Sequence, residues 1–466
     1  MSKKNILETL VNDNDIKVKK TLAQNPNAPA DILEKLSQDE DWEIRATVAE
    51  NLNTPSYILE KMVNDISFNV KRAIATNPNA TPKILEKLAN DKWDSDIIKE
   101  YIRQYRIINK DNSPEELIKL ANDKDYEVRE YVAKNPKTPI ETLEKLAQDK
   151  DKYVRANVAQ NPNTTADILE KLSNDRDSYV KSRMVDNPNI LHQTLEKLSQ
   201  DEDDDVRKSV AYSNSTPADI LAKLSNDEDD EVRKYIAKNI NTNSKTLTKL
   251  SNDKNKYVRA YVTENPSTPV HLLEKLSQDE DRLVRAYVAD NPNTSVELLK
   301  ILSQDKSELV RMAVAENPNI PKEILDKLSQ DREYLVRQGV AQNPLIDIKL
   351  LEKLANDEHW EVRRSVAYNE NTPSNILAQL ANDESWGVRE AVAKDPKTPA
   401  KILEELADDE EWEVRINVVN NPNTSHETLI KLANDKHHAI RRSVAKNPNI
   451  DKVDTPQQKK SINPTM

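Results

Sequence analysis

A 26-residue pattern recurs along almost the whole chain, and it limits the fold more than any other feature. The stretch VRANVAQNPNTTADILEKLSND at 154–175 returns with small changes at 284–305 and 362–383. Aligned on the Asn that precedes Pro, the pattern has 17 stations from Asn25 to Asn447. A period of about 20 to 50 residues is typical of a solenoid, in which each repeat is stabilised by its neighbours. The sequence therefore predicts a repeat array in place of separate globular domains.

The first half of each repeat predicts a short helix. In the motif V-R-x-x-V-A, Val154, Val158 and Ala159 fall on one face at helical spacing. An Asp, Ser or Asn usually stands three residues before the first Val, as Asp151 does, where its side chain can cap the helix. The helix is expected to stop at Asn161, because the Pro that follows disfavours helical geometry there.

The second half predicts another short helix, which begins at Thr-Pro or Thr-Ser. At Thr54 and Pro55 we expect the Thr side chain to cap the helix and Pro to occupy its first position. Leu169 and Leu172 mark the apolar face. Helices this short do not persist alone, so stacking of neighbours must bury both apolar faces. The constant Asn-Pro column is interpreted as turn chemistry, since Asn tolerates left-handed geometry.

The full pattern, V-R-x-x-V-A-x-N-P-x-T-P-x-x-x-L-x-x-L-A-x-D, closely resembles the leucine-rich repeat variant (LRV) family over about residues 5–450. The resemblance implies an all-α fold: a right-handed α-solenoid (superhelix) of about 17 two-helix repeats, each one period long. It also implies that one helix of each repeat can be of the tighter 3₁₀ type. Some relatives carry a Cys-ligated iron–sulfur segment at the N-terminus. This chain has no Cys, so that cofactor is not expected.

One repeat departs from the period. The interval from Asn77 to Asn135 exceeds two periods by six positions, and the extra residues belong to one divergent unit. That unit is a tolerated insertion, a local bend or a docking loop. Because Arg103 stands at an apolar station of the divergent unit, we expect this unit to open before its neighbours. We also expect it to separate two cooperative blocks of repeats. We predict four segments: N-terminal repeats at 1–90, the divergent unit at 91–116, a main array at 117–450 and a polar C-terminal tail at 451–466.

Two basic columns run along the repeats. A basic residue follows the first Val of every repeat, 13 Arg and 4 Lys, and Asp stands six residues earlier in 16 of the 17. This column could form a groove for nucleic acid, whose affinity comes chiefly from phosphate neutralisation. Because each basic group has one Asp carboxylate available, the pattern favours a ladder of Asp–Arg pairs between neighbouring repeats, as in HEAT-type repeats. The second column is a Lys two residues after the first Leu, present in 13 of 16 repeats. We interpret it as a solvated face of mixed sign, since the net charge of the chain is −12.

Function is expected where the repeats differ. Aromatic residues recur two positions before the first Val and three positions after it. Rows of aromatic side chains on a regular scaffold are favoured anchors for a partner, but they can equally fill gaps between neighbouring repeats. The candidate partner-binding residues are Trp42, Tyr235, Tyr261, Tyr287, Tyr334, Trp360, Trp386 and Trp412.

No catalytic, cofactor or metal site is predicted. The chain has two Gly, no Cys and six scattered His, so it lacks a Gly-rich phosphate loop and the spacing of metal ligands. No apolar run reaches the about 18 residues of a membrane span, and no signal peptide is evident, so we expect a cytoplasmic protein. The leading hypothesis is a non-enzymatic scaffold that binds another protein. The alternative is nucleic-acid binding through the Lys and Arg columns, and a chromophore-lyase activity rests only on analogy with other helical repeats.

Overall fold

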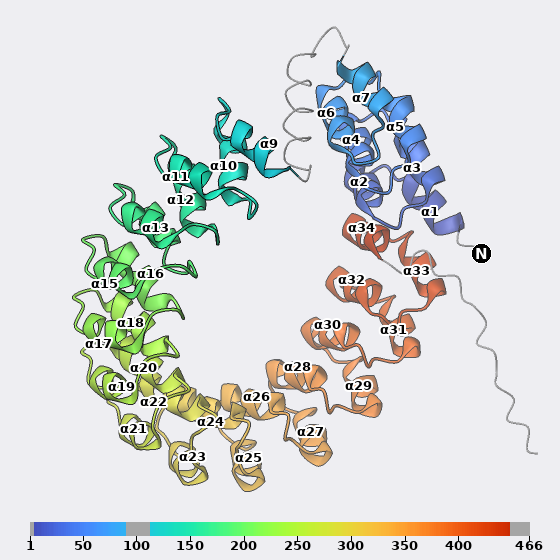
Figure 1. The fold of residues 1–466 in the computed structure, drawn as a ribbon. Coiled ribbons are helices and arrows are strands. Elements are labelled where there is room, and N and C mark those ends of the chain that lie inside the picture. The colour runs from blue at the N-terminus through green and yellow to red at the C-terminus, as the bar shows by residue number, and fades with distance from the viewer. Residues whose placement is uncertain (1–3, 90–111, 448–466) are drawn as a thin grey trace, which may run out of the picture. The chain divides into compact units, whose positions relative to one another are not determined.

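The repeats fold into two rows of short helices (Figure 1). The computed structural model describes residues 4–89 and 112–447, and all regular structure within these ranges is helical. The A helices, built on the V-R-x-x-V-A motif, are α2 (Ile16–Gln24), α4 (Trp42–Glu50), α6 (Phe68–Thr76), α10 (Tyr126–Lys134), α12 (Lys152–Gln160), α14 (Ser178–Arg183), α16 (Asp204–Tyr212), α18 (Asp230–Lys238), α20 (Lys256–Glu264), α22 (Arg282–Asp290), α24 (Glu308–Glu316), α26 (Tyr334–Gln342), α28 (Trp360–Tyr368), α30 (Trp386–Lys394), α32 (Trp412–Asn420) and α34 (His438–Lys446). The B helices, built on the Leu stations, are α1 (Lys4–Val11), α3 (Ala30–Leu36), α5 (Ser56–Met62), α7 (Pro82–Ala89), α9 (Pro114–Leu120), α11 (Ile140–Leu146), α13 (Ala166–Leu172), α15 (His192–Leu198), α17 (Ala218–Leu224), α19 (Ser244–Leu250), α21 (Val270–Leu276), α23 (Val296–Leu302), α25 (Lys322–Leu328), α27 (Ile348–Leu354), α29 (Ser374–Leu380), α31 (Ala400–Leu406) and α33 (His426–Leu432).

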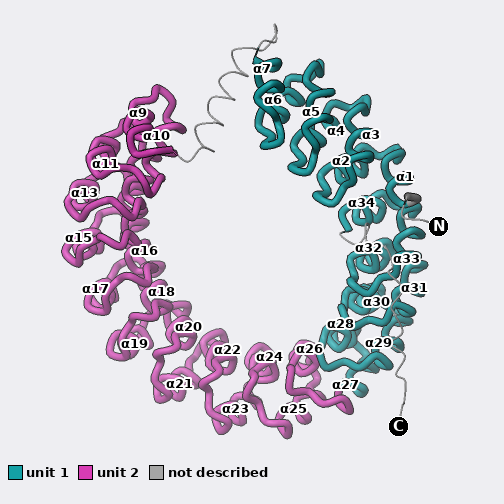
Figure 2. The backbone as a smooth tube through the Cα atoms, turned by 45° about the vertical axis from the view of Figure 1, so that its right-hand side comes forward, with its two compact units in different colours: residues 1–106, 351–466 teal, residues 107–350 magenta. Residues whose placement is uncertain are grey.

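The helices belong to two compact units, which Figure 2 distinguishes by colour. Unit 1 consists of residues 1–106 and 351–466, and unit 2 of residues 107–350. Within each unit, successive A helices pack directly on one another. Within each unit, the A helices form one row and the B helices form the other. The fold is thus an α-solenoid, as the period predicts.

The A helices form as their sequence pattern predicts. Val154, Val158 and Ala159 of α12 are completely buried. The side chain of Asp151 caps the helix by accepting a hydrogen bond from the backbone N–H of Tyr153 at 2.8 Å. The helix ends before Asn161, whose backbone is extended. The apolar stripe and the stop at Asn-Pro are therefore confirmed.

The B helices begin differently from the prediction. At α5 the cap position is Pro55, and Thr54 does not cap the helix. The hydroxyl of Thr54 instead donates to the carbonyl oxygen of Val48 in the preceding A helix, 2.6 Å away. The predicted arrangement does occur at α9, where Ser113 caps the helix and Pro114 is its first residue. At most other Thr-Pro steps the hydroxyl makes the same bond to the last turn of the A helix, where carbonyl oxygens have no N–H partner within the helix.

Both helices of each described repeat are α-helices, and 3₁₀ geometry is confined to their ends. In α13 the N–H of Ser173 donates to the carbonyl oxygen of Leu169, four residues earlier, at 2.8 Å. The next N–H, that of Asn174, donates to Lys171, only three residues earlier, at 3.2 Å. The tighter turn therefore closes the B helix and does not form it.

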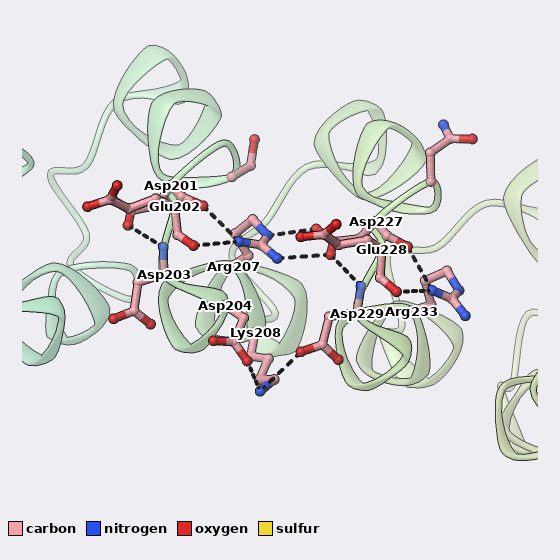
Figure 3. Close-up of polar contacts among 12 residues, drawn as sticks. Asp201, Glu202, Asp203, Asp204, Arg207, Lys208, Asp227, Glu228, Asp229 and Arg233 are labelled. Carbon is pink, nitrogen blue, oxygen red and sulfur yellow. Dashed lines mark hydrogen bonds and ion pairs between the residues drawn. The ribbon is translucent and has the colours of Figure 1, made fainter.

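An Arg–Asp ladder joins neighbouring repeats (Figure 3). Nε and one terminal nitrogen of Arg207 donate to the two carboxylate oxygens of Asp227, in the connection that leads to the next A helix, at 2.8 and 3.1 Å. The other terminal nitrogen donates to the backbone carbonyls of Asp201 and Glu202, in the connection before its own helix, at 2.9 and 3.2 Å. The same bidentate pair recurs along both units, for example between Arg155 and Asp175. The ladder interpretation of the Arg column is confirmed.

The Asn column joins repeats as well, which corrects its interpretation as turn chemistry alone. Nδ2 of Asn161 donates to the carbonyl oxygens of Ala133 and Asn135 in the preceding repeat, at 2.7 and 2.9 Å. Its Oδ1 accepts the backbone N–H of Asn163, so the turn contribution is present too. Because Ala133 is fully buried, the amide satisfies a carbonyl oxygen that water does not reach, while the Asn135 carbonyl also accepts the N–H of Thr138. Joints with Asn at this station therefore have an ionic contact and an amide contact, whereas Ser213 and Asp395 replace the Asn at two stations.

The Lys column of the B helices contributes at the outer side. Nζ of Lys171 lies 2.6 Å from Oε1 of Glu144 in the preceding repeat, and Lys275 donates to Oδ1 of Asn252 at 2.7 Å. The Lys171 and Glu144 side chains remain 61% and 50% exposed, so this pair is screened by solvent. The column forms a mixed-sign, hydrated face, as predicted.

Two of the predicted segments fall largely outside the described residues. These are the divergent unit at 91–116, of which only residues from 112 onward are described, and the tail at 451–466. The early opening of that unit around Arg103 and the four-segment division remain predictions.

Loss of a ladder Arg should weaken one joint strongly. We expect Arg155→Met to reduce the free energy of opening between α12 and α14 by about 3–5 kcal/mol, because it leaves the buried Asp175 carboxylate without its guanidinium. Lys171→Met is the matched control, since loss of its exposed pair should cost about 0–1 kcal/mol. Native-state hydrogen exchange of the amides in α12 to α14 measures both values. Equal effects of the two substitutions would contradict the ladder's role.

The ladder should also make the fold sensitive to acid. Burial opposes the ionisation of Asp175, but hydrogen bonds from Arg155 and from the backbone N–H of Asp177 outweigh burial and hold its pKa below the usual value. A carboxyl group with a lower pKa in the folded chain stabilises the fold above its unfolded pKa, and this is lost as the pH falls through the folded value. The pKa is lowered in the same way at other rungs, namely Asp13, Asp65, Asp149, Asp279, Asp305, Asp331 and Asp435.

We therefore expect the melting temperature to hold steady near neutral pH and to fall progressively below about pH 4. Circular dichroism in the far ultraviolet follows the transition. The double variant Arg155→Met with Asp175→Leu lacks one rung and should lose slightly less stability over the same interval. A melting temperature that stays flat to about pH 2 would show that the carboxylates do not stabilise the fold.

Candidate partner-binding surface

Tyrosine side chains from successive A helices pair with each other in unit 2. Tyr235 of α18 lies between the buried Val232 and Ile236, at the edge of the apolar face, and is half-buried. Its ring meets that of Tyr212 of α16 edge to face, with centroids 5.5 Å apart. Tyr212 itself is 70% exposed, which is high for so large an apolar ring.

A second pair lies further along the chain. The rings of Tyr261 in α20 and Tyr287 in α22 meet edge to face, with centroids 6.2 Å apart, and both are half-buried. Nζ of Lys238 in α18 lies over the Tyr261 ring, 3.9 Å from its centroid, so a cation covers one face of this pair. We call Tyr212, Tyr235, Tyr261 and Tyr287 the tyrosine surface.

A pocket opens beside the first pair. It has a volume of about 380 Å³ and is lined by residues of α14, α16 and α18: Ser182, Asp205, Lys208, Ser209, Tyr212 and Tyr235. The two rings supply apolar walls, while the carboxylate, the ammonium and the hydroxyls supply polar groups. Pockets of this size with a few convergent polar groups are typical of binding sites.

The charges around the pocket are already paired with each other. Lys208 donates to Asp204 in its own helix and lies 3.3 Å from Oδ2 of Asp229 in the next repeat (Figure 3). The hydrogen bond with Asp204, opposed by partial burial, raises the pKa of Lys208 above its usual value. In the second pair, burial and the nearby Glu264 carboxylate raise the pKa of Tyr287. Lys208 therefore stays charged and the Tyr287 phenol stays neutral at physiological pH.

The sequence identified part of this surface. The structure brings the predicted Tyr261 and Tyr287 together, and it pairs the predicted Tyr235 with Tyr212, which the sequence analysis missed. Tyr212 is the last residue of its A helix, and Tyr235 lies within the next one. Lys238 is likewise the last residue of its A helix, and Tyr261 stands at the same position of the following A helix as Tyr235 does. A search for side chains at these two positions of neighbouring A helices could have found Tyr212. The predicted Tyr334 is half-buried at the start of α26.

The predicted Trp residues lie at the first position of their A helices in unit 1. Trp42, Trp360, Trp386 and Trp412 are between 37% and 49% exposed. The Trp412 ring stacks on His437 in the next repeat, with centroids 4.5 Å apart. Trp360 lies so close to α30 that a Cβ added at Gly387 would stand 2.9 Å from its Cζ3. Trp360 and Trp412 thus cover part of the next repeat while leaving one edge exposed.

Comparison with known families identifies the repeats. Residues 126–151 and 360–385 match the family described as Leucine rich repeat variant, and each stretch spans one A helix and the B helix after it. These two stretches are LRV repeats. The shared V-R-x-x-V-A and Leu columns extend the LRV pattern to the neighbouring repeats.

Solved structures with helical repeats are similar to the chain. One is a leucine-rich repeat variant with a novel repetitive structural motif: it is 29% identical, covers 48% of this chain and 88% of its own, and has a TM-score of 0.35. Kap121p bound to Nup53p is 12% identical over 95% of this chain and 54% of its own, with a TM-score of 0.29. Kap95p with RanGDP is 13% identical over 96% of this chain and 60% of its own, with a TM-score of 0.27. No curated protein sequence matches this LRV chain.

Within residues 4–89 and 112–447, no group of three or more His, Asp or Glu side chains is placed to hold a metal ion. None of the helices in these ranges is both long enough and apolar enough to cross a membrane.

The contact between Trp360 and Gly387 can be tested directly. We expect Gly387→Ala to push the Trp360 indole toward solvent, because the new methyl would lie well inside the optimal carbon–carbon separation of about 3.5–4.0 Å. Fluorine NMR of protein labelled with 5-fluorotryptophan reports this change, with Trp360→Phe assigning the resonance. Trp42 in α4 is the internal control, and a Trp360 resonance that does not move would contradict the contact.

Proposed function

We propose that this LRV chain is a non-enzymatic scaffold that binds another protein on the tyrosine surface. The observation that carries the proposal is the pairing of Tyr212 with Tyr235 beside a pocket of about 380 Å³. Tyr rings offer a large and rigid contact area, and they are enriched among the residues that dominate protein interfaces. Tyr212 and Tyr235 stand at positions that vary between repeats, whereas the columns that hold the repeats together are nearly constant.

The alternative, nucleic-acid binding, loses its main support. Arg207 and Arg233 of the same helices donate their guanidinium N–H groups to Asp227 and Asp253, and both side chains are almost fully buried. A guanidinium already bound to a carboxylate and to carbonyl oxygens has almost no donors left for phosphate. The net charge of −12 also opposes a polyanion. A protein partner fits these features better.

Two further parts of the proposal follow from composition. Families of repeat solenoid scaffolds are generally without enzymatic activity, and the described residues that line the pocket include no nucleophile paired with a base. The sequence has no cysteine, which fits a reducing compartment, so we place the scaffold in the cytoplasm.

The test compares partner capture by three forms of the full chain. We expect Tyr212→Ala with Tyr235→Ala to lower the recovery of the bound proteins by about tenfold or more, because loss of a central aromatic anchor costs at least about 1–2 kcal/mol. Tyr57→Ala is the matched control, since Tyr57 is exposed on the B helix α5 and its hydroxyl contacts Glu34. Capture from native lysate with quantitative mass spectrometry, followed by titration of the purified partner, gives both numbers.

Two outcomes would overturn the proposal. Equal loss for the Tyr57 control and the double variant would show that the tyrosine surface is not the binding site. Recovery that disappears on nuclease treatment and falls steeply with salt would point to nucleic acid instead. The Trp360→Ala, Trp386→Ala and Trp412→Ala variants, measured beside the tyrosine variants, separate a second contact surface from packing between repeats.

A further inference from the structure

The first and the last described A helices form the same joint as two neighbouring repeats. Both belong to unit 1, where α2 packs against α34. Nε and a terminal nitrogen of Arg441 donate to Oδ2 and Oδ1 of Asp13, at 2.5 and 3.1 Å. The internal pair Arg415 and Asp435 has the corresponding distances of 2.7 and 3.0 Å. One pair spans 428 residues of sequence and the other spans 20.

The amide contact is repeated as well. Nδ2 of Asn25 donates to the carbonyl oxygen of Ala445 at 2.8 Å. In the internal joint, Nδ2 of Asn51 donates to the carbonyl oxygen of Ala23 at 2.7 Å. Asp13 is only 6% exposed and its pKa is lowered: burial opposes the shift, but the hydrogen bonds from Arg441 and the backbone N–H of Asp15 outweigh it. This joint therefore has the same bidentate ion pair as an internal one, together with the amide contact to the preceding A helix.

Helix α1 takes the place of the B helix that would follow α34. In an internal joint, the Asp that receives the Arg comes shortly after a B helix, as Asp435 comes after α33. Asp13 likewise comes shortly after α1, which contacts both α33 and α34. Its Ile6, Leu7 and Leu10 are buried.

We propose that the face of α1 and α2 and the face of α33 and α34 are the two halves of one docking interface, which closes within the chain and, when held open, binds a second copy of the same chain end to end. The occupant follows from the chemistry of each half. The α34 half presents the Arg441 guanidinium and the carbonyl oxygen of Ala445. These groups bind an Asp carboxylate and an Asn amide that have the spacing of Asp13 and Asn25. Another copy of the chain presents that set on its own α1 and α2.

The first measurement tests closure within the chain. Because the sequence has no cysteine, spin labels attach only where Cys is introduced. Gln24→Cys with Lys446→Cys places labels at the last positions of α2 and α34, and Asn420→Cys with Lys446→Cys places them at the last positions of α32 and α34. We expect pulsed electron–electron double resonance to give the same short distance for both pairs. A long distance for the first pair alone would overturn the proposal.

The second measurement opens the interface by reversing one charge. Asp13→Arg leaves two cations facing each other, and Arg441→Asp leaves two anions. We expect either change to reduce the short-distance population of the terminal pair by at least about tenfold, because opposed like charges strongly disfavour the closed joint. The distance between positions 420 and 446 should not change. The double variant, Asp13→Arg with Arg441→Asp, restores opposite charges and should restore the short distance.

The third measurement tests for a second copy as the partner. Each single variant should be monomeric alone, since its two ends repel. Mixed together, the Asp13→Arg chain and the Arg441→Asp chain present opposite charges to each other and should form mixed oligomers, which mass photometry detects. Arg415→Asp and Asp435→Arg, the matched internal reversals, should give no oligomers when mixed. The proposal would be overturned if the mixed terminal variants stayed monomeric although the two ends of each chain were apart. It would also be overturned if the two ends of a single variant stayed together.

Discussion

Most joints between repeats depend on a guanidinium that is bonded on two sides, whereas Lys19 and Lys181 supply an ammonium at two joints. A charged Arg that is less than a tenth exposed, as Arg155 is, would destabilise the fold if its charge and its donors lacked partners. Here Nε and one terminal nitrogen take both oxygens of Asp175, and the other terminal nitrogen takes the carbonyl oxygens of Asp149 and Lys150. The carbonyls belong to the preceding connection and the carboxylate to the next. The Arg therefore sets the distance between repeats, and the Val and Leu contacts form at that distance.

This polar joint explains how so hydrophilic a chain folds. Only 36% of its residues are hydrophobic and 4% are aromatic. A repeat of two short helices buries little apolar area by itself. The Arg–Asp pair and the Asn amide add directional contacts at most joints, and directional contacts also fix the register of one repeat on the next. Because the constant columns hold the array, the variable positions of the A helices are free to carry the tyrosine surface.

The sequence predicted what repeats locally and missed what depends on distance between helices. The A-helix stripe, the Asp cap and the pairing of Arg with Asp follow from spacings shorter than one period, and all three are confirmed. Thr54 was misassigned because a cap and a bond back to Val48 look identical in sequence. Tyr212 was missed because its partner lies across a helix contact, at a spacing that differs from the period. The joint between Arg441 and Asp13 has no local signal, although the Asp13 station has the same motif as the other rungs.

Uniform joints create a problem of their own during folding. Any Arg of the column can donate to any Asp of the column, so a chain that pairs Arg363 with the wrong Asp loses little ionic energy, and misaligned arrays compete with the native one. The contact of Trp360 with Gly387 removes this degeneracy locally. The ring fits over Gly387 because that residue has no Cβ, whereas the corresponding residue in the next A helix is Glu413. Trp360 therefore distinguishes its true neighbour from the others. In a chain of nearly identical units, the residues that break the pattern encode the order in which the units assemble.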